Sequence, residues 1–114
     1  TTHHCLEAAE KLAEEGIECE VLDLRSLVPM DKEAIINGVK RIGKVLVVHE
    51  DKVHSGFGAE IAATIMEEAF EYLDGPVHRV GSPFTPVGFH PILERAILPN
   101  TTKIYEAAKK ILAY

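Results

Sequence analysis

The sequence predicts an α/β protein, with three layers (α/β/α) around a mostly parallel sheet. Segments with helical periodicity alternate with short β-branched runs along the 114 residues, which is typical of a sheet covered by helices on both faces. The run Lys44–Val48 is almost entirely apolar, as expected for a strand buried between two helical layers. Glycine or proline separates most of these segments. We therefore expect one domain over residues 1–114.

The first part of the chain predicts a helix, a strand and a second helix. Thr1 or Thr2 can cap the first helix, which Gly16 ends. Ile17–Leu24 has the apolar positions of a strand. Asp31 is placed to cap the second helix, and Gly43 follows its last turn. The buried faces of these two helices are expected to consist of Cys5, Leu6, Ala9, Leu12 and Ala13, and of Ile35, Ile36, Val39 and Ile42.

The second part predicts two more strands and three helices. The strand Lys44–Val48 stops at the polar triplet 49–51, and a glycine turn at 56–58 opens a long helix over about Ala59–Leu73. The remaining elements are expected at Val77–Val80 (a strand), Pro91–Leu98 and Thr102–Ala113 (helices).

The order of these elements leaves the sheet short of one strand. The chain opens directly with a helix, whereas a doubly wound domain has a strand ahead of its first helix. We therefore expect that an upstream strand is lacking and that the chain is a fragment of a longer subunit.

The composition excludes several classes of protein. A formal net charge of −6 without a clustered basic face argues against a nucleic-acid partner. No apolar run has the length of a membrane span, and no leader segment is evident. Only two cysteines are present, which we expect to be buried and reduced. These features favour a cytoplasmic protein, or one of the mitochondrial matrix if the source is eukaryotic.

The chain lacks the motifs of a self-contained active site. His49, Glu50 and His54 do not have the HExxH spacing that puts two histidines on one helical face. The glycine turn at 56–58 is followed by Ile61 where a dinucleotide fingerprint needs a third glycine. No GxSxG motif occurs. We therefore expect no catalytic, cofactor-binding or metal-binding residue.

Two surfaces are predicted to contact other proteins. The first lies at the carboxyl edge of the sheet, where ligands and partners collect in α/β folds, and at a proline-bounded loop rich in large apolar residues. Its members are His49, Glu50, Gly56, Phe57, Gly58, Phe84, Val87 and Phe89. The second is an acidic docking surface for a basic partner. Glu67 and Glu71, four residues apart on the long helix, form it with Asp74 and the terminal carboxylate of Tyr114. A merely solvated helix face is the alternative.

Three blocks of sequence resemble a known family. They are Gly16–Asp31 (GI…EVLDLRSLVPMD), Val47–Ile61 (VVHE…GFGAEI) and Pro76–Asn100, with its Thr85–Pro86 and Leu98–Pro99 pairs. Together they resemble the carboxy-terminal domain of the transketolase superfamily. The greatest similarity is to the beta subunit of thiamine-diphosphate-dependent 2-oxo acid dehydrogenases of the pyruvate, branched-chain or acetoin type.

This resemblance implies a role in subunit assembly and partner docking. The parent enzyme would use thiamine diphosphate and Mg²⁺, held by other domains, to decarboxylate a 2-oxo acid oxidatively and acylate lipoyl. The implied partners are the remaining domain of the beta subunit, the alpha subunit, a second beta subunit and the dihydrolipoamide acyltransferase. Two alternatives stay open: a domain of a transketolase or deoxyxylulose-phosphate synthase, and a non-enzymatic interaction module.

Overall fold

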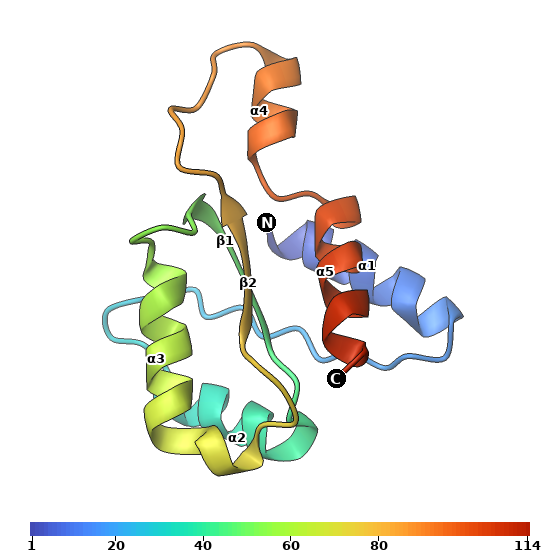
Figure 1. Cartoon of the computed structure of the whole chain (residues 1–114), viewed down its shortest axis with the longest axis vertical. Helices are drawn as coiled ribbons and strands as arrows, with labels where there is room; N and C mark the ends of the chain where they lie inside the picture. Colours follow the sequence, from blue (N-terminus) through green and yellow to red (C-terminus); the bar gives the residue numbers. More distant parts are fainter.

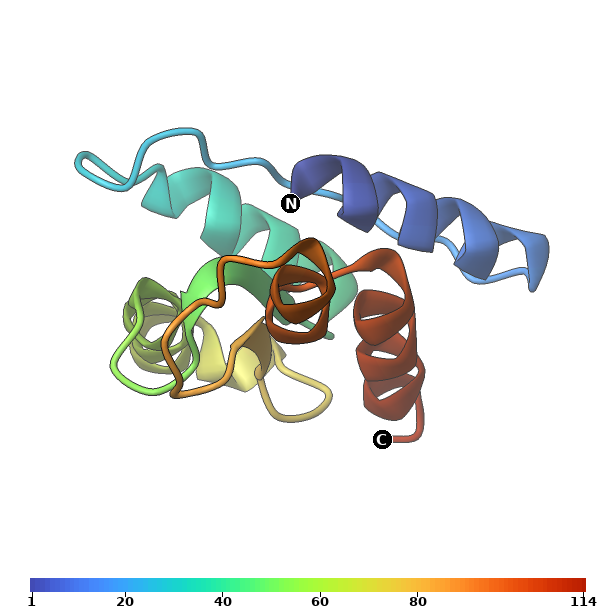
Figure 2. The ribbon, with the colours of Figure 1, turned by 90° about the horizontal axis from the view of Figure 1, so that it is seen from above.

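The computed structural model describes residues 1–114 as a layered arrangement of helices around a small sheet (Figure 1). The elements are α1 (Thr2–Glu14), α2 (Lys32–Ile42), β1 (Leu46–Lys52), α3 (Phe57–Ala69), the 3₁₀ helix η1 (Phe70–Tyr72), β2 (His78–Ser82), α4 (Pro91–Ile97) and α5 (Thr101–Leu112). β1 and β2 are parallel neighbours. α3, backed by α2, covers one face of the sheet, and α5, backed by α1, covers the other (Figure 2). The predicted three-layer α/β class is confirmed.

Capping residues set both boundaries of α2 as predicted. The Asp31 carboxylate accepts a hydrogen bond from the Ala34 amide at 3.0 Å, which fixes the start of α2. Gly43 ends that helix in the left-handed conformation, with a φ of 76° that favours glycine. The sequence did not single out Asn100, whose side chain accepts a hydrogen bond from the Lys103 amide at 3.0 Å and starts α5. No helix is both long enough and apolar enough to cross a membrane.

The predicted strand at Ile17–Leu24 is wrong. This segment follows an extended path past α1 (Figure 2), but it belongs to no strand. None of the peptide groups from Glu18 to Asp23 forms a backbone–backbone hydrogen bond. A strand exists only where a neighbouring strand supplies hydrogen bonds, and no strand lies beside this segment. The sheet therefore has two strands instead of the three expected.

β1 extends beyond its predicted end and includes the polar triplet His49–Asp51. Its first residues pair in register with β2, Val48 opposite Val80, and the register shifts before Lys52 pairs with Ser82. Four residues of β1 thus span the distance covered by two of β2, as in a β-bulge. The Ser82 hydroxyl donates to the Glu50 carbonyl oxygen at 2.6 Å and holds this irregular stretch in the sheet. The triplet is therefore part of a strand and not a free tip.

α3 ends earlier than predicted. Ala69 has a φ of −143°, which interrupts the α-helical backbone before η1 begins. Glu71 lies in η1, outside the α-helix that contains Glu67. The expectation that Glu67 and Glu71 share one face of a single α-helix is therefore wrong.

The buried apolar residues form two separate groups. One joins α2, β1 and α3 and consists of Ile35, Val39, Val47, Ile61, Ile65 and Ala69. The other lies on α1 and α5 and consists of Ala8, Leu12, Ile104 and Ile111. Between them runs a groove of about 880 Å³, lined by members of both groups, by β1 and by Ile17–Arg25. We call it the central groove.

Candidate functional site

The ring of His49 fills a niche made of three glycines. A Cβ atom at Gly56 would lie 2.9 Å from the His49 Cε1 atom, and one at Gly81 would lie 3.1 Å from it. A Cβ atom at Gly58 would overlap the ring itself. The glycine turn at the start of α3 and the end of β1 therefore come together, because only glycine lets the backbone approach this side chain so closely.

The imidazole ring of His49 is enclosed within this chain. Both of its ring nitrogens are buried and have no hydrogen-bond partner. Burial lowers the pKa of His49 because the charged form loses its solvation. The nearby Asp51 raises the pKa by a smaller amount. The arrangement suits packing against α3 and offers no exposed nitrogen for acid–base chemistry.

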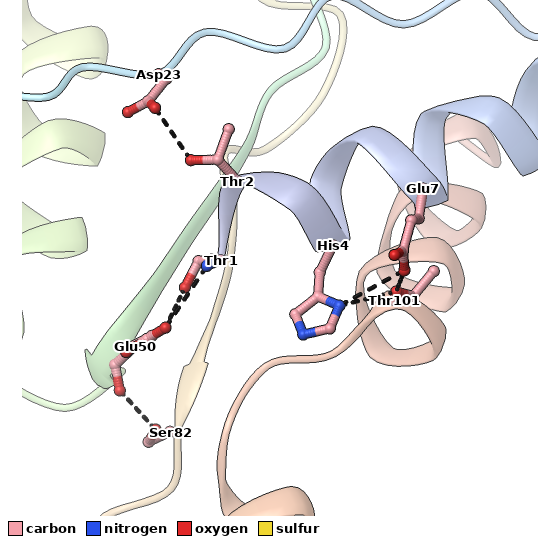
Figure 3. A network of polar contacts seen from close by, with 8 residues as sticks. All are labelled: Thr1, Thr2, His4, Glu7, Asp23, Glu50, Ser82 and Thr101. Atoms are coloured by element: carbon pink, nitrogen blue, oxygen red, sulfur yellow. Dashed lines mark hydrogen bonds and ion pairs between the residues drawn. The ribbon is translucent and has the colours of Figure 1, made fainter.

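Glu50 follows His49 along β1, and its side chain is mostly exposed to solvent. Its carboxylate accepts a hydrogen bond from the Thr1 hydroxyl at 2.7 Å, and the Thr1 ammonium lies 3.6 Å away (Figure 3). The Thr1 hydrogen bond lowers the pKa of Glu50, and the ammonium group adds to the effect. This contact fixes the start of α1 beside the carboxyl half of β1.

A second polar network joins α1 to α5. The ring of His4 lies 3.1 Å from the Thr101 hydroxyl, and that hydroxyl also bonds to Glu7 (Figure 3). Thr2 donates to the Asp23 carboxylate at 3.2 Å and links α1 to the unpaired segment. These contacts position elements relative to one another, and they bring no nucleophile to a base.

The segment between β2 and α5, which includes α4, projects beyond the carboxyl edge of the sheet (Figure 1), and its large apolar residues are exposed. We call residues 83–97 the apolar arm. Phe89 is fully exposed, Phe84 is 72% exposed and Val87 is 49% exposed. α4, which ends the arm, has no buried residue at all. The sequence singled out the three loop residues but missed Ile92 and Leu93 on α4, which are also exposed. The sequence signal that could have indicated their exposure is the pair of adjacent apolar residues on this seven-residue helix.

The acidic patch, Glu67, Glu71, Asp74 and Tyr114, lies toward the other end of the sheet. All four residues are exposed. A Cβ atom on Gly75 would lie 3.2 Å from the Tyr114 Cβ atom, so Tyr114 packs beside the turn that carries Asp74. Basic groups are interspersed there: Lys44 Nζ donates to the Asp74 carbonyl oxygen, and Lys40 lies over the Tyr72 ring.

The structure holds no arrangement suited to a metal ion. No group of three or more His, Cys, Asp or Glu side chains is close enough to form such a site. Cys5 is half-buried and Cys19 is exposed, so the expected burial of Cys19 is wrong, and both thiols are free.

The comparisons with known proteins agree on one family. Residues 1–104 match the model of the family described as transketolase, C-terminal domain. The chain is 44% identical to "Pyruvate dehydrogenase E1 component subunit beta, mitochondrial" of Dictyostelium discoideum, over 95% of the chain and 30% of that protein. It is 39% identical to "Acetoin:2,6-dichlorophenolindophenol oxidoreductase subunit beta" of Bacillus subtilis, over 94% of the chain and 31% of that protein.

A solved structure shares the fold. The chain resembles "Split gene transketolase, inactive beta4 tetramer" with a TM-score of 0.84 and 30% identity, over 98% of this chain and 36% of that one. The chain thus spans about 30% of the length of the curated relatives that it matches. The family match, the relatives and the shared fold agree: the chain belongs to the transketolase C-terminal domain family.

Proposed function

We propose that this chain is the subunit-assembly and partner-docking domain of a 2-oxo acid dehydrogenase beta subunit. The parent enzyme would decarboxylate a 2-oxo acid oxidatively on thiamine diphosphate and pass the acyl group to lipoyl. The names of the similar proteins, which are beta subunits of pyruvate and acetoin enzymes, support this assignment. A location in the cytoplasm or the mitochondrial matrix accords with it.

The observation that carries the proposal is the apolar arm. Phe84, Phe89 and Ile92 are each at least two-thirds exposed and are close together in the chain. Large apolar side chains gathered in this way mark surfaces that another protein covers. The arm therefore supports an interface with the remaining domain of the beta subunit, the alpha subunit or a second beta subunit. Glu50, which is exposed, and Phe57, which is partly buried, are the further proposed members of that interface.

The arm can be tested in the full-length beta subunit. We expect Phe84→Ser with Phe89→Ser to weaken assembly with the alpha subunit, measured by sedimentation, because truncating buried aromatic anchors commonly costs about 2 kcal/mol or more each. Phe70→Ser is the matched control, since Phe70 is 66% exposed and begins η1, directly after α3. The end of α3 lies at the opposite end of the molecule from the arm (Figure 1). Normal assembly of the arm variant would remove the support for this proposal.

The residues of this chain do not fit thiamine diphosphate or Mg²⁺. No cluster of metal ligands is present. The glycine turn at the start of α3, which could otherwise cradle a diphosphate, is filled by the His49 ring. We therefore assign cofactor binding and catalysis to other parts of the parent enzyme.

The acidic patch is the proposed docking surface for the basic peripheral-subunit-binding domain of the dihydrolipoamide acyltransferase. The exposure of the carboxylates of Glu67, Glu71 and Asp74 supports it, because like charges exposed on a surface steer a cationic partner. Solvation of these groups with no partner is the alternative.

A second candidate function is a domain of a transketolase-type enzyme. The solved split-gene transketolase favours it, at 30% identity, against 39–44% for the dehydrogenase subunits. Assays of the full-length protein with its partner subunit separate the candidates: decarboxylation of a 2-oxo acid supports the first, and ketol transfer or deoxyxylulose-phosphate synthesis supports the second. Absence of all three activities would favour a non-enzymatic interaction module.

A further inference from the structure

The carboxyl end of α4 is bonded to one side chain of α5. Lys103 Nζ donates to the Ala96 carbonyl oxygen at 2.6 Å and to the Leu98 carbonyl oxygen at 2.9 Å. The last carbonyl groups of a helix have no partner within that helix. The Lys103 ammonium group therefore satisfies acceptors that α4 itself leaves free, and it does so from a different helix.

α4 has little else to hold it in place. None of its seven residues is buried, and it projects past the amino end of α5 (Figure 1). An isolated helix of this length is marginal in water. Because burial contributes so little here, the bonds from Lys103 carry much of the burden of orienting α4.

The stretch of chain that carries Lys103 is well fixed. Its neighbour Ile104 is 4% exposed and belongs to the buried group of α1 and α5. Pro99, in the connector between α4 and α5, is buried too. The Asn100 side chain accepts a hydrogen bond from the Lys103 amide at 3.0 Å. The ammonium group therefore extends from a firmly held backbone toward a helix that stands free.

The charge of Lys103 favours α4 over its own helix. Lys103 lies in the first turn of α5, where a cation is unfavourable beside the free amide groups. Beside the last carbonyl groups of α4 the same cation is favourable, because the partial charge there is negative. The position of this lysine thus suits the end of α4 better than the start of α5.

The bonds from Lys103 cross a connector that could otherwise act as a hinge. Leu98 ends α4 with an extended backbone, at a ψ of 151°. Rotation at Leu98 would turn α4, and with it the exposed side chains of Ile92 and Leu93, while Pro99 stays buried. Because Lys103 bonds to carbonyl groups on both sides of Ile97, it opposes this rotation.

Within the apolar arm, the loop follows α4. A Cβ atom on Gly88 would lie 2.6 Å from the Leu93 Cβ atom, so the loop packs closely against the helix. The His90 side chain accepts a hydrogen bond from the Ile92 amide at 3.3 Å. The direction of α4 therefore also sets the direction of Phe89, which lies between these two contacts.

We propose that Lys103 is the positioning residue of the apolar arm: its ammonium group ties the end of α4 to α5 and presents the arm in the orientation that another subunit contacts. This inference rests on the proposed function, because it assigns to Lys103 a role in assembly through the arm. Lys103 itself need not touch the partner.

Removal of the ammonium group in the full-length beta subunit tests the tie. Lys103→Met keeps an aliphatic side chain and a good helix former. We expect the amides of Arg95–Leu98 to exchange hydrogen about threefold faster or more, because partly exposed bonds from a charged group are lost. Mass spectrometry with millisecond labelling measures this. Lys110→Met, at an exposed residue in the last turn of the same helix, removes the same charge and should leave α4 unchanged.

A conservative variant separates the tie from general loosening of α5. Lys103→Arg retains the positive charge and several N–H donors, so exchange in α4 should return to within about twofold of its original rate. Amides around Ile104 should stay protected in every variant. Lys103→Gln, which is uncharged and a good helix former, replaces Lys103→Met in the comparison if α5 loosens in the methionine variant.

Association with the alpha subunit tests the role in assembly. The apparent affinity of a protein falls with the population of its binding-competent conformation. We expect Lys103→Met to slow association about threefold or more and to change dissociation less, because in the complex the partner itself holds α4. Lys103→Arg and Lys110→Met should associate at the original rate. Stopped-flow measurement compares the four subunits.

Three results would overturn the inference. Unchanged exchange of α4 in Lys103→Met means that other contacts hold this helix. Faster exchange that Lys103→Arg does not restore assigns the effect to loosening of α5. An unchanged association rate in Lys103→Met, with impaired assembly of the variant that combines Phe84→Ser and Phe89→Ser, refutes the role of Lys103 while the proposed function stands. Normal assembly of that arm variant instead removes the proposed function, and with it the role of Lys103 in assembly.

Discussion

The contact between His49 and Gly58 leaves no room for a methyl group. A Cβ atom at position 58 would overlap the imidazole ring. We expect Gly58→Ala to lower the free energy of unfolding by about 1–3 kcal/mol, because a packed site resists added volume. Urea denaturation of the chain measures this change.

Two further variants test the cause of that loss. In a His49→Ala background, the added methyl group at position 58 meets no ring, so Gly58→Ala should cost less there. Gly38→Ala in α2 is the matched control, because its new Cβ atom would have no neighbour closer than 3.7 Å. We expect that change to stabilise the chain by about 0.5–1 kcal/mol. A loss at position 58 that is the same with and without the His49 ring would contradict this account.

Burial of His49 also predicts a dependence of stability on pH. The pKa of His49 in the folded chain lies below its ordinary value of 6.5. The unfolded chain therefore binds a proton more readily, so stability falls as the pH drops below about 6.5 and this group has no effect well above that pH. His49→Gln removes the titrating group. We expect unfolding curves between pH 7 and pH 5.5 to show a weaker pH dependence for the variant, and an unchanged slope would argue against it.

At the level of elements, α4 is the helix with the least support. It has seven residues, none of them buried, and isolated helices of this length are marginal in water. We expect the amides of Ile92–Ile97 to exchange rapidly in this chain, while those around Ile104 in α5 exchange slowly. Assembly of the full-length subunit should then slow exchange in α4. Equal protection of α4 and α5 in the unassembled chain would contradict the prediction.

The helices followed from the sequence, but the strands did so only in part. A cap such as Asp31 acts on its own helix, so local sequence predicts it. The segment Ile17–Leu24 has the composition of a strand, yet pairing depends on a neighbour that local sequence does not describe. In β1, polar residues suggested an end of the strand, whereas the bond from Ser82 to Glu50 continues it.

The candidate site, like the strands, was predicted from the sequence only in part. Glycines at 56 and 58 correctly indicated a close approach of the backbone at the start of α3. The side chain that fills this space, His49, comes from a different element and was expected at a surface between domains. Its burial depends on Gly81 as well, a residue more than 30 positions away. Exposure of Phe84 and Phe89 was predictable, because the prolines around them prevent a regular element from burying the loop.

For the whole molecule, charge governs the proposed docking to the acyltransferase. We expect Glu71→Lys with Asp74→Lys, in the full-length subunit, to slow association about tenfold or more at low salt and less at high salt. Glu10→Lys with Glu14→Lys on α1 makes the same change in net charge away from the patch and serves as the control. Stopped-flow measurement over a salt series compares them. Equal rates for both variants would leave Glu71 and Asp74 as ordinary surface charges.

The chain as a whole is also expected to bind no thiamine diphosphate. It offers no metal-ligand cluster, and His49 fills the glycine niche. Calorimetric titration with the cofactor and Mg²⁺ should give no heat of binding. Binding with micromolar affinity would mean that cofactor contacts have been assigned to the wrong part of the parent enzyme.

The division of the apolar interior into two groups has a consequence for how the molecule melts. Cooperative unfolding requires that loss of one part of the core destabilises the rest. Here the buried residues of α1 and α5 lie outside the core cluster of α2, β1 and α3, and an open groove runs between the two groups, so thermal energy can separate them in succession. Heating should then give a broad transition whose van't Hoff enthalpy is smaller than the calorimetric enthalpy.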